Sequence, residues 1–338
     1  MSRGRLPLAL ASVLALVAAV HVAVGRTGPG VGEFVAWLGS LLGLGGVDPL
    51  DGYVLADIRT PRVLVAAFGG AALAVAGAVM QATFRNPLAS PDIVGTAAGA
   101  AFGATLAILL RVADLGVAVT PIAALLGATL VTGLVFALAG SHGRFSVANL
   151  LLAGIALNTL FGALTAFAVT LRFDNYTASS RILLWLMGGL DARTWEHAGI
   201  TMIGFALFSA LVWPRVRELD LLTLRDDSAH SLGVDAPRAR RLLVWYACGL
   251  TATTVANSGG IAFVGLVVPH LARLMVGPAH ALLLPTSALL GAVLMVGSDL
   301  GCRLAPAQWN LRLGVVTAVA GAPYFLFLLA RQRRGAAL

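Results

Sequence analysis

Long apolar runs alternate with short polar connectors along nearly the whole chain. Gly, Pro or charged residues bound each run. The runs cover residues 6–24, 63–83, 93–111, 117–139, 148–170, 198–213, 242–258, 261–276, 281–301 and 313–330. A helix rises about 1.5 Å per residue, so about 20 apolar residues cross the hydrocarbon core of a bilayer. The pattern predicts an all-α polytopic membrane protein with about ten transmembrane helices.

The first apolar run follows Arg3 and Arg5, an arrangement that also occurs in signal peptides. The apolar part of a signal peptide spans about 7–15 residues, and this run is longer. We therefore expect an uncleaved first helix, with a cleaved signal peptide as the alternative.

An even number of spans places both termini on one side of the membrane. The arginines at both ends of the chain assign that side to the cytoplasm, because basic residues favour the cytoplasmic face. The loops at 84–92, 140–147, 214–241 and 277–280 are then cytoplasmic. With the termini, they carry 13 Arg, against 9 on the outer side, while Arg273 lies within a helix. This bias is weak, so the outer arginines need a further explanation.

Two segments are longer than simple connectors. The outer segment 26–57 contains an apolar stretch from Phe34 to Leu44, which predicts a helix lying on the membrane surface. The inner segment 214–241 carries several charges, and a short helix within it can begin near Asp226 and end at Gly233. We expect residues 1–338 to form a single transmembrane domain, with this inner segment as its one sizeable cytoplasmic element.

The composition supports a membrane location and excludes several chemistries. Hydrophobic residues make up 59% of the 338 residues, charged residues make up 11%, and the mean hydropathy is +0.90. The 23 basic residues are all Arg, so the chain has neither a Walker A lysine nor a Schiff-base lysine. No His, Cys or carboxylate cluster has ligand or triad spacing. We expect no metal, no cofactor and no enzymatic activity, and we interpret Cys248 and Cys302 as small core residues.

Ionisable groups are almost absent from the predicted spans. Only Asp299, near the outer end of the ninth span, is acidic. A proton-coupled carrier usually has such groups along its path, so a gradient-driven mechanism is disfavoured. We expect Asp299 to pair with Arg303, four residues further along the helix. A functional role for Asp299 is the alternative.

Small residues recur at helical spacing within the spans. Gly95, Gly99 and Gly103 repeat every four residues, which allows close helix packing. The fifth span carries a stripe of small and polar residues. This stripe could line a translocation path, or its asparagine could bond to a neighbouring helix, and the sequence leaves both open. The stripe consists of Gly154, Asn158, Gly162 and Thr165.

Several sequence motifs, in order, resemble the FecCD family, the permease subunits of binding-protein-dependent ABC importers for iron-siderophores, haem and cobalamin. RTPR (59–62) precedes GGAALAVAGAVMQATFRNPLASPDIVGTAAGAAFGA (69–104). Later motifs are LLLAGIALN (150–158), WLMGGLDARTW (185–195), HSLGV (230–234), GGIAFVGLVVPHLAR (259–273) and GVVTAVAGAPYFLFLL (314–329). The RNPLA-P and GL-VPH-R motifs together are highly specific, and the likeness covers nearly the whole chain.

The resemblance implies a BtuC-like permease fold in a bacterial or archaeal cytoplasmic membrane. It also implies a dimer with a second copy or a paralogue around a central path, two cytoplasmic ATP-binding subunits that hydrolyse ATP with Mg²⁺, and an extracytoplasmic substrate-binding protein. In such permeases the long inner loop contains a coupling helix that contacts the ATPase. The matching positions run from Leu224 to Val234 and include Leu224, Asp226, Ala229, Leu232 and Gly233.

The resemblance also implies a role for the outer arginines. The R-x-P-R motif and an Arg after the ninth helix match Arg59, Arg62 and Arg303, positions that meet acids of the binding protein in this family. Anchoring in lipid headgroups is the alternative. Where the family often has Glu-x-Pro before the last helix, this chain has Asn310-Leu311-Arg312, which could add a fourth docking Arg. Where the family often has Gly-Glu, it has Arg225-Asp226.

The function expected from the sequence is the permease subunit of an ABC importer for a metal chelate. A ferric siderophore is the first expectation, because that cargo is commonest in the family; haem and cobalamin are the others. A gradient-driven secondary carrier or channel is the alternative, and it would need no ATPase.

Overall fold

The computed structural model describes residues 5–140, 147–171, 176–224 and 231–335, and every regular element in this part of the chain is helical. Ten helices coincide with the ten predicted spans, which confirms the predicted architecture. They are α1 (Leu6–Ala23), α4 (Thr60–Phe84), α5 (Thr96–Leu109), α6 (Val119–Ala139), α7 (Val147–Thr170), α9 (Trp195–Val212), α12 (Ala236–Ser258), α13 (Val264–Val276), α14 (His280–Leu304) and α15 (Leu313–Gly335). The others are α2 (Val31–Leu41), α3 (Pro49–Tyr53), α8 (Tyr176–Leu186) and α10 (Val216–Leu222).

Six helical runs of the described chain are long and apolar enough to cross a membrane: α1, α3 with α4, α6, α7, α9 with α10, and α14. Helices α5 and α13 are shorter, with 14 and 13 residues. Each follows irregular backbone: the 3-10 turn Pro91–Val94 precedes α5, and residues 259–263 precede α13. Irregular backbone at membrane depth is tolerated where protein covers it, and these two segments contain no exposed residue.

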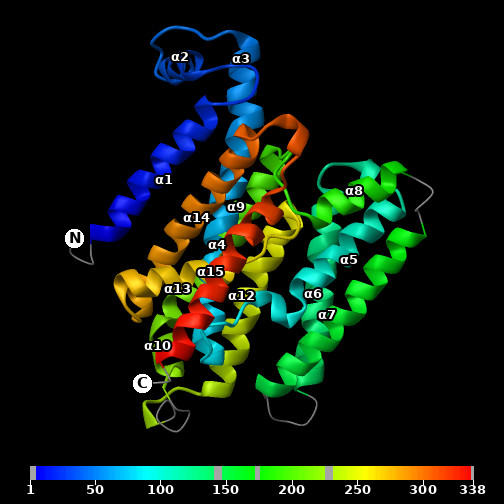
Figure 1. The fold of residues 1–338 in the computed structure, drawn as a ribbon, viewed down its shortest axis with the longest axis vertical. Helices are drawn as coiled ribbons and strands as arrows, with labels where there is room; N and C mark the ends of the chain where they lie inside the picture. The colour runs from blue at the N-terminus through cyan, green and yellow to red at the C-terminus, as the bar shows by residue number, and fades with distance from the viewer. Residues whose placement is uncertain (1–4, 141–146, 172–175, 225–230, 336–338) are drawn as a thin grey trace.

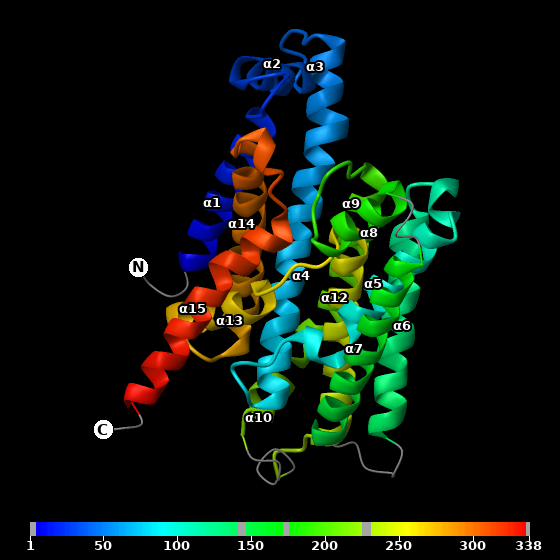
Figure 2. The ribbon, with the colours of Figure 1, turned by 45° about the vertical axis from the view of Figure 1, so that its right-hand side comes forward.

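Helix α4 forms the centre of the molecule (Figures 1 and 2). It contacts α9, α12, α13 and α14, and glycines allow two of these contacts. A Cβ at Gly70 would overlap the carbonyl oxygen of Gly291 in α14, and a Cβ at Gly77 would overlap that of Gly265 in α13. The backbones therefore meet directly, as small residues permit in membrane helices.

The predicted glycine packing of α5 is confirmed. A Cβ at Gly99 would overlap the carbonyl oxygen of Gly127, and a Cβ at Gly103 would overlap that of Ala123, both in α6. Gly95 has φ +86° and caps the start of α5, a conformation that favours glycine.

The two ends of the molecule differ. Helices α2 and α3 lie at one end, and α10 lies at the opposite end (Figure 1). The end with α2 is the outer one by the predicted topology. Helix α2 lies across this end, as expected for the apolar stretch at 34–44, although it begins and ends three residues earlier (Figure 2). The carboxylate of Glu33 accepts a hydrogen bond from the Gly30 backbone N–H and caps this helix.

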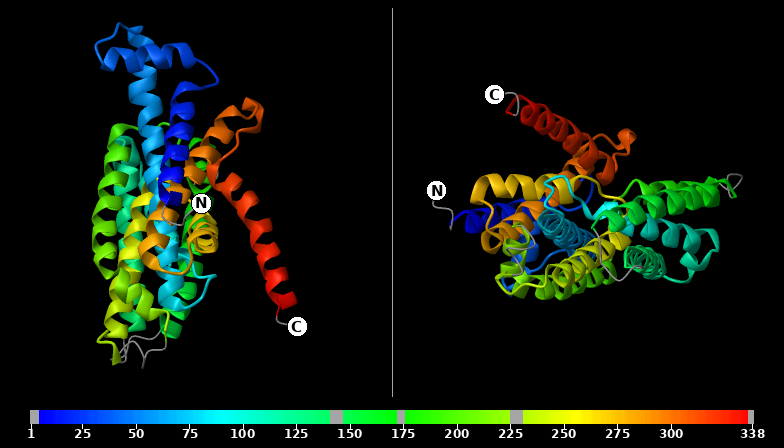
Figure 3. Two further views of the ribbon diagram at one scale, coloured as in Figure 1. Left: turned by 90° about the vertical axis from the view of Figure 1, so that its left-hand side faces the viewer. Right: turned by 90° about the horizontal axis from the view of Figure 1, so that it is seen from below.

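Helix α15 leans away from the other helices (Figure 3). It is joined to α14 by residues 305–312, which include the 3-10 turn Ala307–Trp309 and Asn310 in a left-handed conformation at φ +42°. Its contacts with the rest of the described chain are mainly with α13 and α14. The side of α15 that faces α5 and α12 is therefore open.

Candidate functional site: outer charged cluster, cavities and inner face

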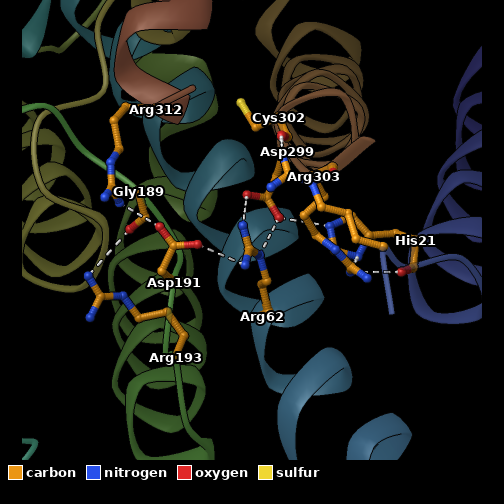
Figure 4. Close-up of polar contacts among 10 residues, drawn as sticks. His21, Arg62, Gly189, Asp191, Arg193, Asp299, Cys302, Arg303 and Arg312 are labelled. Atoms are coloured by element: carbon orange, nitrogen blue, oxygen red, sulfur yellow. Dashed lines mark hydrogen bonds and ion pairs between the residues drawn. The ribbon is translucent and has the colours of Figure 1, made fainter. Parts of the chain in front are cut away.

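A buried ionic cluster joins α1, α4 and α14 near the outer end (Figure 4). The guanidinium of Arg62 donates from Nε to Asp299 Oδ2 at 2.7 Å and from Nη2 to Oδ1 at 2.8 Å. His21 Nε2 lies 2.7 Å from the same Oδ2. Asp299 and His21 are almost fully buried. A fully bonded carboxylate of this kind holds the three helices in register.

The expected pairing of Asp299 with Arg303 is wrong. Asp299 instead bonds to Arg62 and His21, which are 237 and 278 residues away. Its carboxylate points toward α1 and α4, whereas Arg303, one turn further along α14, reaches the end of α1 (Figure 4). The spacing of four residues therefore did not determine the partner, because buried tertiary partners were available.

Arg59 and Arg303 cap the C-terminal end of α1. Arg59 Nη1 donates to the carbonyls of Val22 at 2.7 Å and Ala23 at 3.1 Å. Arg303 donates to the carbonyls of His21 and Val24 at 3.0 and 2.8 Å. The last carbonyls of a helix have no partner within the helix and carry partial negative charge, so cations stabilise them. Arg59 is only 3% exposed, and its role in this conformation is internal.

The three predicted docking arginines lie together around one cavity. This cavity has a volume of about 440 Å³, and four arginines and one aspartate line it. The charged lining residues are Arg26, Arg59, Arg62, Arg303 and Asp191. The positive charges exceed the negative ones, so the cavity attracts an anionic group from outside.

Asp191 bridges this cavity to a second one. Its carboxylate accepts from Arg62 Nη1 at 3.1 Å and from Arg312 Nη1 at 2.5 Å, and it is more than half exposed. The second cavity has a volume of about 780 Å³ and lies between α5, α8 and the segment before α15. Arg181, Arg193 and His197 line it together with Arg312.

Only part of the small and polar stripe of α7 faces open space, and the rest of it packs against neighbouring backbone. A Cβ at Gly154 would overlap the carbonyl oxygen of Ile93, and Asn158 Nδ2 donates to the Asp92 carbonyl at 2.9 Å. These contacts fix the turn before α5, which is the packing alternative considered for Asn158. Thr165 bonds within its own helix to Phe161, whereas Gly162 faces open space.

A third hollow runs beside α15. It has a volume of about 450 Å³, its lining is mainly apolar, and small residues of α15 and of the link before α13 form much of it. These residues include Gly260, Ala262, Gly314 and Ala318. Its edge includes Leu186 and Val255, which are sequence neighbours of Trp185 and Ala256 in the 780 Å³ cavity. The two hollows therefore border the same parts of α8 and α12, although no residue lines both.

The inner end contains part of the predicted coupling segment. Leu224 and Leu232 are about half exposed, and Gly233 has φ +83° just before α12. Asp226 and Ala229 lie outside the described residues. Nearby, Asp220 of α10 accepts from the His280 backbone N–H at 3.0 Å, and Arg85 Nε donates to the Leu222 carbonyl at 2.8 Å. These bonds join α10 to the ends of α4 and α14.

Sequence reasoning missed the partners of the outer arginines. His21 and Asp191 stand in different segments, and their positions in the sequence do not indicate that they meet Arg303 and Arg62. A histidine near the end of a first membrane span was the one available signal, because buried polar groups in spans need partners. Within the described part of the chain, no group of three His, Cys, Asp or Glu residues could hold a metal ion.

Comparisons with known proteins agree with this architecture. The model of the FecCD transport family matches residues 10–331. The cobalamin import system permease protein BtuC of Halobacterium salinarum is 41% identical, over 87% of this chain and 77% of that protein. The Fe(3+) dicitrate transport system permease protein FecD of Escherichia coli is 42% identical, over 83% and 86%.

A solved structure shows the same fold. It is a metal-chelate type ABC transporter in an inward-facing conformation, 32% identical, and the match covers 97% of this chain and 99% of that chain with a TM-score of 0.84. Because the family model and these relatives cover most of its length, this multi-pass membrane protein belongs to the FecCD transport family.

Proposed function

We propose that this chain is the permease subunit of a binding-protein-dependent ABC importer that carries a metal chelate into the cell. The observation that carries the proposal is the fold match to a metal-chelate type ABC transporter along 97% of the chain. The chain is a transport subunit and has no lysine for a phosphate-binding loop, so ATP hydrolysis resides on two partner ATP-binding subunits.

The proposed cargo is a ferric siderophore, with haem and cobalamin as the other candidates. The relatives are named for different chelates, cobalamin in one case and ferric dicitrate in another. All of these are large, which requires a wide path with small or weakly polar walls. The hollow beside α15 has such walls.

A second permease, identical or related, completes the path. The hollow beside α15 is open on one side in the single chain. Val315, Val319 and Phe327 of α15 are exposed apolar side chains on this outlying helix. A partner permease placed against α15 would enclose the cargo between two such surfaces.

The outer cluster is the proposed docking surface for the binding protein. Arg59, Arg62 and Arg303 each have internal bonds, so docking uses the excess positive charge around the 440 Å³ cavity rather than three free side chains. Charge complementarity of this kind mainly speeds the association of the two proteins and sets the orientation in which they bind. Acidic side chains on the binding protein are the expected counterparts.

The inner segment from Leu224 to Val234 is the proposed ATPase contact. Leu224, just after α10, and Leu232 expose apolar surface, and the bonds of α10 to α4 and α14 connect this part of the segment to the centre of the molecule. Movement of the ATPase would reach the spans through these contacts.

Purification with and without the ATP-binding subunits tests the assignment. The isolated chain is expected to bind and hydrolyse no ATP, whereas the complex hydrolyses ATP, and cargo-loaded binding protein stimulates it. Stoichiometric nucleotide binding by the isolated chain would overturn the proposal, as would failure to form a complex with the ATP-binding subunits.

A further inference from the structure

Among the described residues that line the 780 Å³ outer cavity, one cation has no carboxylate partner. Two of its three arginines form ion pairs: Arg181 with Asp114 at 2.8 Å and Arg312 with Asp191 at 2.5 Å. Among the described residues, no carboxylate contacts the guanidinium of Arg193, and Asp191 acts on it only through space. Its one carbonyl contact, to Gly189, is long at 3.3 Å (Figure 4).

The surroundings of Arg193 are unfavourable for a charge. Its Nε is buried and has no hydrogen-bond partner, and burial lowers the pKa of the guanidinium to about 10. A poorly solvated charge destabilises a site unless an opposite charge compensates it. The described chain supplies no such charge in contact with Arg193.

His197 adds a second donor beside this guanidinium. The Thr194 backbone N–H donates to His197 Nδ1 at 3.3 Å, so Nδ1 is an acceptor and the neutral ring carries its hydrogen on Nε2. Nε2 lies 3.4 Å from Arg193 Nη1, which also carries hydrogens. Two donors therefore face each other with no acceptor between them, and His197 is only 3% exposed.

We propose that Arg193 and His197 form a subsite for a carboxylate of the transported chelate. This inference rests on the proposed function, because it assigns the charge of the cargo. A carboxylate presents two acceptor oxygens and one negative charge, which match the paired donors and the uncompensated cation. The volume of the cavity suits a sizeable ligand.

The position of the cavity favours the cargo as the source of this carboxylate. Trp185 and Ala256 line the cavity, and their neighbours Leu186 and Val255 line the hollow beside α15. A carboxylate at Arg193 would therefore hold the chelate beside the segments of α8 and α12 that also border the proposed path. Neutral chelates would gain nothing from this subsite, so it selects anionic cargo.

Equilibrium binding to the full-length chain in lipid nanodiscs tests the subsite. The probes are ferric citrate and a neutral ferric trihydroxamate, titrated at constant ionic strength. Ferric citrate is expected to bind the wild type at least tenfold more tightly than Arg193→Gln, while Arg193→Lys, which keeps the charge, loses less. The control Arg111→Gln, at an exposed arginine that does not line this cavity, is expected to change binding less than twofold.

Three outcomes would overturn the subsite: no binding of ferric citrate to the wild type, equal binding to Arg193→Gln, or equally effective competition by chloride, which would indicate a general anion site. If Arg193→Gln binds ferric citrate normally and loses only affinity for the binding protein, the carboxylate comes from that protein and our assignment is wrong. ATP is absent from this experiment. A negative result alongside intact ATP-driven uptake would thus reject the subsite and leave the proposed function standing.

Discussion

At the scale of single residues, the outer arginines have two tasks. They bond the end of α1 and the buried Asp299, and they surround a cavity that faces the outside. The sequence indicated that arginines on this side need a reason, because the positive-inside rule disfavours them. It could not indicate the internal bonds, since Arg59 and Arg303 reach partners 36 and 282 residues away.

Asp299→Asn is expected to destabilise the protein strongly. The change leaves Arg62 without its buried carboxylate, and breaking a buried ion pair costs about 3–5 kcal/mol. Denaturant unfolding in mixed micelles would measure the loss in unfolding free energy. The control Asp114→Asn breaks a half-exposed pair with Arg181 and should cost about 0–1 kcal/mol. Equal losses in the two variants would contradict the structural role of Asp299.

Asp191→Asn is expected to strengthen docking of the binding protein. The variant removes the negative charge that bridges Arg62 and Arg312, so the excess positive charge of the 440 Å³ cavity rises. Surface-based binding measurements should show faster association, with a larger gain at low salt. Asp114→Asn makes the same change of charge away from this cavity and serves as control. Unchanged association of Asp191→Asn would argue against docking here.

At the scale of elements, the hydropathy pattern predicted ten helices, and the structure confirms each of them. Their ends and irregular parts were harder to predict. Helix α12 begins at Ala236, although its first turns carry Arg238, Arg240 and Arg241, because an Asp235 cap and a cytoplasmic position suit a polar helix start. The breaks before α5 and α13 follow from buried backbone contacts, which a hydropathy pattern does not contain.

Gly77→Ala is expected to weaken the packing of α4 on α13. The added methyl would overlap the carbonyl oxygen of Gly265, and overpacking of this kind costs about 1–3 kcal/mol. Gly297→Ala on α14 is the control, because no heavy atom lies within 4 Å of its added Cβ. Thermal unfolding in detergent should show a lower midpoint for Gly77→Ala only. A wild-type midpoint for Gly77→Ala would show that α4 and α13 can move apart freely.

Leu232→Asp is expected to weaken assembly with the ATP-binding subunits. The change places an unpaired charge in the proposed apolar contact, which can cost several kcal/mol. Co-purification of a tagged chain with its ATPase measures the loss. Leu44→Asp, at an exposed leucine of the outer segment, controls for an added charge at the opposite end. Normal assembly of Leu232→Asp with the ATP-binding subunits would show that the coupling contact lies in another segment.

At the scale of the whole molecule, the single chain is an incomplete transporter. Its hollow beside α15 is open on one side, its outer cavity carries excess positive charge, and its inner leucines are exposed. Each of these surfaces corresponds to one proposed partner: a second permease, a binding protein and an ATPase. The motifs of the sequence predicted this set of partners, whereas the three cavities required the arrangement of helices in space.

Uptake by the complete complex in sealed proteoliposomes tests the central claim most directly. Labelled ferric siderophore and its binding protein are added outside, and ATP or a non-hydrolysable analogue is enclosed inside. We predict uptake that requires both enclosed ATP and the binding protein, and that an imposed proton gradient does not replace ATP. Uptake driven by the gradient in vesicles that contain only this chain would contradict the account and identify a secondary carrier.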